Sequence, residues 1–210
     1  MSFDKESQLM KFMLWLSDMA HLQFLWLVGT FAGLVVGGFF PATVAVFAVL
    51  RRIIRHDRDF NFTIEFWKNY KENILDGNLL GYLLVLIGMI LAFYTRTSIQ
   101  IDNGFAYLFL ALSFGFMALF ILSVVYIFTS YVHFDLSMLE VIRHAIIIMF
   151  LSPLADLKII GIIALFGWSV SQFPVLVPFV SIAVFCYFIM RIVYRAIEAI
   201  SPAGKIQTSD

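Results

Sequence analysis

The chain has 210 residues, of which 62% are hydrophobic and 13% are charged, and its mean hydropathy is +0.95. Soluble domains carry about 25% charged residues, so this composition excludes an ordinary soluble domain and predicts an all-α, polytopic transmembrane helix bundle. Fourteen basic and fourteen acidic residues leave no net charge, so we expect the lipid bilayer as surroundings and no nucleic-acid partner.

Three long runs contain no Asp, Glu, Lys or Arg: residues 19–50, 103–134 and 159–190. A continuous helix over any of them would be about 48 Å long, well beyond the hydrocarbon thickness of about 30 Å. We therefore look for breaks inside the runs. No removable signal peptide is expected, because no small-residue cleavage pattern follows the first run.

The first run is interrupted by Gly37, Gly38 and Pro41. Glycine accepts the backbone angles of a turn and proline suits the first turn of a helix, so we predict one helix over about 13–36 and a second over about 41–55. The second has few apolar residues before the arginines. It either crosses with its arginines reaching the headgroups or stops partway at 37–41 as a re-entrant element.

An amphipathic helix is predicted over 63–76, because Ile64, Trp67, Tyr70 and Ile74 recur at helical spacing while charged residues face away. Residues 77–95 follow without a charge and match one membrane thickness. We expect this third membrane helix to leave the inner face directly after the amphipathic one.

The middle run has no proline, and it predicts one long, tilted helix over about 104–132. A second amphipathic helix is predicted over 138–151, because Ser137 and Glu140 form a capping box and Ser152-Pro153 ends it. The last run breaks in a polar segment that ends at Pro174, which predicts helices over about 157–168 and 174–200.

The count is about six membrane helices, or five if the first run is a single kinked span, in one membrane domain over 1–210. Basic residues stay cytoplasmic, and the six-helix count leaves one of the fourteen outside, Arg96. We therefore predict a multi-pass protein of a cell membrane with both termini in the cytoplasm. The two amphipathic helices are expected on the inner face.

Few residues suggest chemistry. The best candidate cluster is His133, Asp135, Glu140 and His144, which we interpret as the polar start of a capped helix in preference to a reacting group. Asp156 and Lys158 are interpreted as anchors where a helix leaves the membrane. The single cysteine, Cys186, is interpreted as a packing residue. We expect no catalytic residue, no metal site and no cofactor, hence no enzyme.

Gly29, Gly33 and Gly37 form a G-x-x-x-G-x-x-x-G ridge on the first predicted helix. Small residues at this spacing allow two helices to approach closely. We expect the neighbour to be another helix of the same chain, and the sequence does not indicate an oligomeric state.

An ordered set of motifs in the first half of the chain resembles the YesL-like family of bacterial integral membrane proteins. The motifs are Gly33-Leu34, Phe-Pro-Ala-Thr at 40–43, an aromatic stretch ending in Arg51, Phe-Trp-x-x-Tyr-Lys at 66–71 and Asn-Leu-Leu-Gly at 78–81. The resemblance implies these candidate family-motif or partner-facing residues: Gly33, Phe40, Pro41, Ala42, Thr43, Arg51, Phe66, Trp67, Tyr70, Lys71, Asn78 and Gly81.

The resemblance implies an accessory membrane protein that assists an ABC-type carbohydrate importer, whose subunits would be its partners. The alternative is a small transporter or channel acting alone, with a broken-helix site at 37–41. An enzyme acting on lipid or glycan is a third hypothesis. Co-purification with importer subunits favours the first, and solute flux through vesicles that contain only this protein favours the second.

Overall fold

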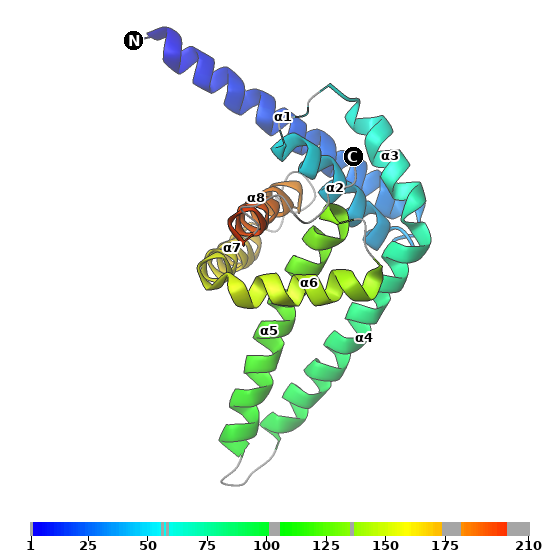
Figure 1. Ribbon diagram of the computed structural model, residues 1–210, viewed down its shortest axis with the longest axis vertical. Coiled ribbons are helices and arrows are strands. Elements are labelled where there is room, and N and C mark those ends of the chain that lie inside the picture. The colour runs from blue at the N-terminus through cyan, green and yellow to red at the C-terminus, as the bar shows by residue number, and fades with distance from the viewer. Residues whose placement is uncertain are drawn as a thin grey trace. The chain divides into compact units, whose positions relative to one another are not determined.

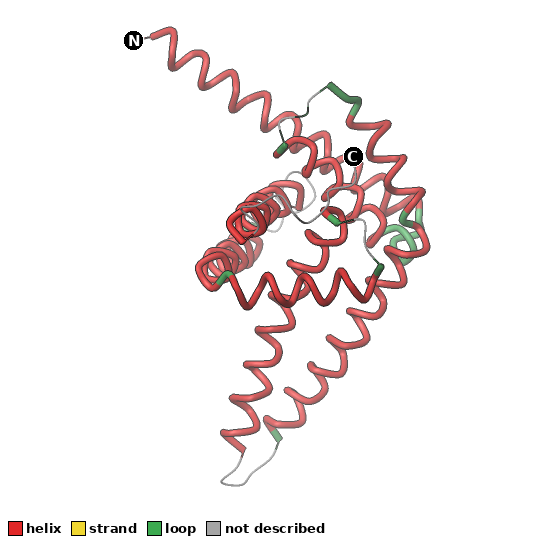
Figure 2. The backbone as a smooth tube through the Cα atoms, in the orientation of Figure 1, coloured by secondary structure: helices red, strands yellow, loops and turns green. Residues whose placement is uncertain are grey.

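The computed structural model describes residues 2–55, 57, 59–100, 106–134, 137–173 and 182–200. Within these ranges the chain is helical, with no strand (Figures 1 and 2). The eight helices there are α1 (Ser2–Ala32), α2 (Phe39–Ile54), α3 (Phe62–Glu72), α4 (Ile74–Ile99), α5 (Ala106–His133), α6 (Met138–Leu151), α7 (Pro153–Gln172) and α8 (Ile182–Ile200).

Each predicted helix overlaps a helix of the structure, and the ends of all but one are shifted. α6 has the predicted bounds, whereas α1 begins at Ser2 and ends at Ala32 instead of spanning about 13–36. The predicted helix over 63–76 ends early, because Asn73 caps α3 and α4 begins at Ile74. Residues 174–181, which belong to the last predicted helix, lie outside the described residues.

Three of the described helices are long and apolar enough to cross a membrane: Ile74–Ile99, Tyr107–His133 and Pro153–Gln172. α2 has only 16 residues, which gives a rod of about 24 Å. α8 carries Arg191, Arg195 and Glu198. The helical membrane protein is thus supported, and the full set of six crossings stays a prediction.

The helices group into two compact units, one made of Met1–Ile74 and Gly161–Arg191 and the other of Leu75–Ile160 and Ile192–Asp210. In the first unit, α1, α2 and α3 pack side by side (Figure 1). α2 supplies much of the core, and its buried residues are Pro41, Ala42, Val44, Ala45, Val46, Phe47, Val49, Leu50 and Ile53. Protein, rather than lipid, therefore covers much of this apolar helix.

The first unit also contains the first half of α8, which packs against α1. The side-chain oxygen of Gln23 accepts a hydrogen bond from the backbone N–H of Ala183 (3.1 Å), and the Trp15 ring meets the Tyr187 ring edge-on at 5.4 Å. Because Gln23 is only 1% exposed, its amide is used inside the protein and satisfies the first turn of α8.

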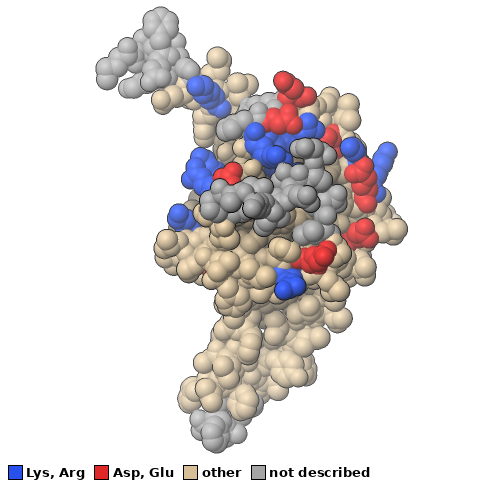
Figure 3. All heavy atoms as spheres, viewed as in Figure 1, with Lys and Arg blue, Asp and Glu red and all other residues tan. Residues whose placement is uncertain are grey.

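In the second unit, α4 and α5 form a hairpin and α6 packs against α5 (Figure 1). The hydroxyls of Ser98 and Ser113 lie 3.1 Å apart, and the Phe120 ring fills the space beside Gly88. Large apolar side chains along the hairpin are exposed, and the lower part of the face seen in Figure 3 shows no charged side chain. This surface suits contact with lipid.

Candidate functional site

The α1–α2 turn, residues 33–38, depends on close backbone contact between glycines. A Cβ atom at Gly33 would overlap the backbone of Gly38, and one at Gly38 would lie 2.5 Å from the carbonyl oxygens of Gly29 and Thr30. The expected break in the first run is therefore present. It is filled by the backbone of the chain itself.

The glycine ridge is used as a contact within the chain, though only Gly29 lies on α1. A Cβ at Gly29 would be 3.1 Å from the Phe66 ring and 3.3 Å from the Tyr70 ring, both on α3. Gly33 and Gly37 belong to the turn, because α1 ends at Ala32. The expectation of an internal neighbour is confirmed for Gly29, and the ridge is shorter than predicted.

The Phe-Pro-Ala-Thr motif ties the start of α2 to α1. The Trp26 indole N–H donates to the Thr43 hydroxyl oxygen at 3.1 Å, and the Thr43 hydroxyl donates to the Phe39 carbonyl at 2.7 Å. Pro41 and Ala42 are buried and Phe40 is half-buried. Thr43 thus satisfies a backbone acceptor and a side-chain donor in an otherwise apolar contact.

The Phe-Trp-x-x-Tyr-Lys motif packs α3 against α1. Phe66 is fully buried and Tyr70 is 6% exposed. The Tyr70 hydroxyl donates to the Gly29 carbonyl at 2.9 Å, and burial raises the pKa of Tyr70. Both rings fill the space that Gly29 leaves open, so of the two alternatives, family-motif or partner-facing, the packing of Phe66 and Tyr70 favours a structural motif. Trp67 is half-buried and Lys71 is exposed.

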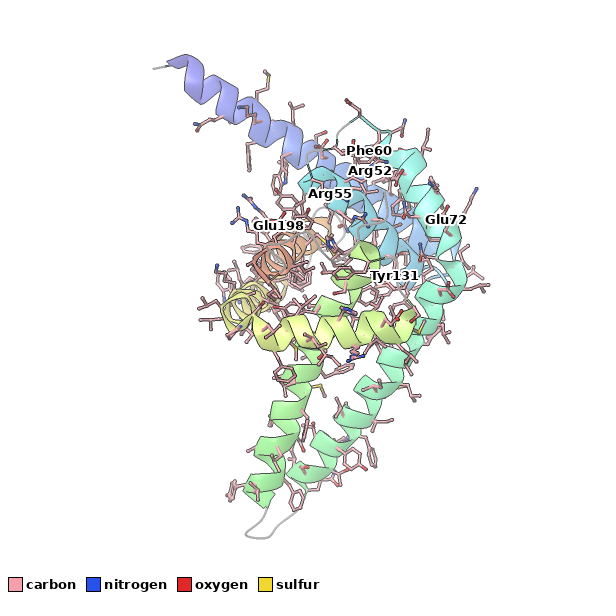
Figure 4. All side chains as sticks on the ribbon, viewed as in Figure 1. Arg52, Arg55, Phe60, Glu72, Tyr131 and Glu198 are labelled. Carbon is pink, nitrogen blue, oxygen red and sulfur yellow. The ribbon has the colours of Figure 1, made fainter. Side chains whose placement is uncertain are left out.

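Arg52 organises the connection from α2 to α3, and it was not among the residues predicted from the sequence. Its guanidinium pairs with Asp57 at 2.7 Å and with Glu65 at 2.9 Å, and it lies 4.1 Å from the centre of the Phe60 ring (Figure 4). The sequence signal for this cluster was an Arg that is followed, within 13 residues, by two carboxylates and an aromatic residue. The predicted Arg51 is half-buried beside it.

Two predicted residues, Asn78 and Gly81, lie on α4 and belong to the second unit. Gly81 is buried and Asn78 is half-buried. The other ten predicted residues lie in the first unit, so the motifs are spread over both units.

The candidate histidine cluster lies where α5 is followed by α6, and the Phe134 ring centre is 4.7 Å from that of His133 and 5.8 Å from that of His144. The Glu140 carboxylate accepts hydrogen bonds from the hydroxyl (2.6 Å) and the backbone N–H (3.1 Å) of Ser137. These bonds lower the pKa of Glu140. His144 Nδ1 lies 2.8 Å from the Glu140 carbonyl, and Asp135 lies outside the described residues. Glu140 is thus engaged as the helix cap that the sequence predicted.

A polar pair joins α5 to α7 in the second unit. The hydroxyl of the fully buried Tyr126 donates to a carboxylate oxygen of Asp156 at 2.7 Å. Asp156 is half-buried, whereas Lys158 is exposed. Asp156 therefore has a specific partner in the protein, beyond the interfacial role that the sequence predicted. Within the described ranges, no group of three or more His, Cys, Asp or Glu side chains could hold a metal ion.

Comparison with known proteins gives relatives along most of the chain. The family model "Protein of unknown function, DUF624" matches residues 19–94. The uncharacterized protein YteU of Bacillus subtilis (strain 168) is 30% identical over 200 residues, which cover 94% of this chain and 88% of YteU. The uncharacterized protein YesL of the same organism is 30% identical over 149 residues, covering 70% of this chain and 68% of YesL.

A third relative from that organism, the uncharacterized protein YesV, is 25% identical over 179 residues, which cover 85% of this chain and 86% of YesV. No solved structure matches. The region matched by the family model contains the α1–α2 turn, the Thr43 and Tyr70 hydrogen bonds and the Arg52 cluster.

Proposed function

This chain belongs to the YesL-like family of bacterial membrane proteins, and on that premise we propose that it is a non-catalytic accessory protein of the cell membrane. Its partners would be the subunits of an ABC-type carbohydrate importer. This assignment of the partner rests on the family resemblance.

One observation supports a scaffold above all. The motif side chains Thr43, Phe66 and Tyr70, with Trp26 as the partner of Thr43, join α1 to α2 and α3 within the first unit. These contacts between helices fix the position of α3 relative to α1 and α2. The surface that they position is the outer face of α3.

The outer face of α3 consists of Ile64, Lys68 and Lys71, which are exposed and recur at i, i+4 and i+7. Ile64 is 69% exposed. An apolar side chain flanked by two ammonium groups suits a partner surface with an apolar recess and acidic side chains around it. A cytoplasmic loop of an importer subunit would offer such a surface.

The proposed placement in the membrane is a multi-pass protein with an even number of crossings and both termini in the cytoplasm. α4, α5 and α7 supply three crossings by length and composition. The basic residues of α2 and α3 support an inner location for that part of the chain, because Lys and Arg concentrate on the cytoplasmic side.

The test is affinity purification of the full-length protein in mild detergent from its own host. The variant K68E/K71E changes the α3 face, and K11E/R143E changes as many exposed charges elsewhere. We expect importer subunits to co-purify with the wild type and the control variant and to be lost with K68E/K71E at an unchanged melting temperature. Equal recovery with both variants, or recovery of the protein alone, would contradict the proposal.

The second candidate is a transporter or channel that uses the 37–41 break as part of its pathway. Discontinuous helices form substrate sites in transporters, and this supports the second candidate. The contact between Gly33 and Gly38 favours the accessory role instead, because backbone atoms occupy the break. Uptake of sugars or ions by vesicles that contain the purified protein alone would support the transporter.

A further inference from the structure

The end of the α1–α2 hairpin carries a surface made of large apolar side chains. We call the tip the five residues Phe31, Leu34, Val35, Val36 and Phe39. They are 67%, 86%, 47%, 68% and 41% exposed in that order. Turns that face water are usually built from Gly, Asn, Asp or Ser, and here Leu34 and Val35 occupy positive φ angles of 55° and 67°. The side chains are apolar where polar ones would fit the backbone better.

Most backbone N–H groups of the tip have hydrogen-bond acceptors within the protein and do not need water as an acceptor. The N–H groups of residues 33–37 and of Phe39 all donate to backbone carbonyls, at 2.8–3.2 Å, and Pro41 has no N–H to satisfy. In hydrocarbon each unsatisfied N–H is costly, so irregular backbone enters a membrane only when its donors are paired. This turn meets that condition for the donors named.

The depth that the tip can reach is limited by α3, which runs beside α1 in the same direction. The His21 side chain lies 3.1 Å from the Thr63 hydroxyl, and further along the Tyr70 hydroxyl donates to Gly29. The exposed Lys68, Lys71 and Glu72 must stay in water or among headgroups, and they hold Gly29 near that level.

The six residue steps from Gly29 to Val35 add at most about 9 Å at a helical rise. This is less than a third of the about 30 Å of hydrocarbon. The contacts of α1 with α8, through Trp15 and Gln23, lie before Gly29 and do not cover the tip.

We propose that the α1–α2 hairpin is re-entrant: its tip inserts among the acyl chains of the cytoplasmic leaflet and the hairpin leaves by the face through which it entered. The hydrophobicity of α2, which suggested a crossing, is explained by its burial inside the first unit. Both termini of the hairpin stay on one side, so the proposed cytoplasmic N-terminus is unchanged.

The single cysteine makes a direct test possible, because Cys186→Ala leaves a background without thiols. In that background, Val36→Cys of the full-length protein carries a spin label in vesicles of phosphatidylethanolamine and phosphatidylglycerol. We expect the label to collide with oxygen, which dissolves in acyl chains, several-fold more often than with a water-soluble nickel complex. The same preference is expected for Phe31→Cys, which keeps the test valid if Val36→Cys does not fold.

Labelling of whole cells with an impermeant maleimide shows from which side of the membrane a cysteine can be reached. Gln100→Cys, at the end of α4, is the control expected to react from outside, and Glu72→Cys is the control expected to react only in opened cells. Val36→Cys is expected to react in neither. Reaction of Val36→Cys from outside would show a crossing hairpin, and nickel access or reaction in opened cells would show a tip in water. A label that meets neither oxygen nor nickel would be buried in protein. Each of these three results would overturn the proposal, and none depends on recovery of importer subunits.

Discussion

The Tyr70 hydroxyl donates a hydrogen bond to the carbonyl oxygen of Gly29, across 41 positions of the sequence. The same glycine lies under the rings of Phe66 and Tyr70. Because glycine has no side chain, α3 approaches the α1 backbone closely enough for both the ring contact and the hydrogen bond. This contact sets the position of α3 on the rest of the first unit.

Phe66→Ala should destabilise the first unit more than Tyr70→Phe does. Phe66 is fully buried, and truncating such a ring costs about 3–5 kcal/mol because a cavity remains. Tyr70→Phe keeps the ring and removes one hydrogen bond, which costs about 1 kcal/mol. Thermal unfolding in detergent, followed by tryptophan fluorescence, measures both. Equal losses in the two variants would contradict the packing described.

Gly38→Ala should strongly destabilise the protein, because its new methyl group would overlap the carbonyl oxygens of Gly29 and Thr30. Overpacking typically costs about 1–3 kcal/mol, and rigid backbone atoms place this site at the upper end. Gly115→Ala is the matched control, since nothing lies within 4 Å of its Cβ position. The midpoint of unfolding should fall for Gly38→Ala and stay or rise for Gly115→Ala. A normal midpoint for Gly38→Ala would mean that the turn is more open than described.

The start of α6 should loosen in acid. Hydrogen bonds from Ser137 lower the pKa of Glu140 in the folded protein, so this carboxylate contributes its stabilisation above its ordinary pKa and loses it as pH falls through the lowered value. Hydrogen exchange of amides in residues 138–141 is expected to quicken over that range. Ser137→Ala should raise the pKa of Glu140 toward its ordinary value, as carbon-13 NMR of the carboxyl group would show.

Ser171→Ala serves as the control for that experiment, because the Ser171 hydroxyl donates to the Trp168 carbonyl within α7. It should leave the titration of Glu140 in place. An unaltered titration in Ser137→Ala would argue against the cap.

The pair Tyr126 and Asp156 should show energetic coupling. The hydroxyl donates to the carboxylate at 2.7 Å, and hydrogen bonds to charged groups contribute about 1.5–3 kcal/mol. A double-mutant cycle with Tyr126→Phe and Asp156→Asn, measured by unfolding in detergent, isolates the shared term. We expect the double variant to lose less stability than the sum of the single ones. Strict additivity would show that the pair contributes nothing beyond its separate contacts.

Local signals predicted the elements with strong end markers well. α6 has its predicted bounds because Ser137, Glu140 and Ser152-Pro153 define both ends through short-range hydrogen bonds. α1 illustrates the opposite case, since its mostly polar start over residues 2–8 gives no apolar pattern and yet belongs to a helix that begins at Ser2. A hydropathy pattern locates the apolar part of a helix, and it does not locate polar turns that extend the same helix.

Hydropathy also does not show whether an apolar residue is surrounded by protein or by lipid. α2 reads like a membrane helix, although most of its apolar residues are buried by other parts of the first unit. Phe66 and Tyr70 read like exposed interfacial aromatics for the same reason, and they are core residues. Arg52 was missed because Asp57 reaches it only through the bend that follows α2, and Glu65 only after the chain reverses into α3.

The shape of the glycine turn has a mechanical consequence. In the re-entrant placement proposed above, the end of the hairpin takes up lateral area in the cytoplasmic monolayer and none in the other, so each copy would expand the monolayer that it enters. An imbalance of area makes a sheet of lipid bend, and insertion of this type depends on curvature. The protein would accumulate where the inner monolayer is already stretched, so Gly33 and Gly38 would influence where in the cell surface the chain resides.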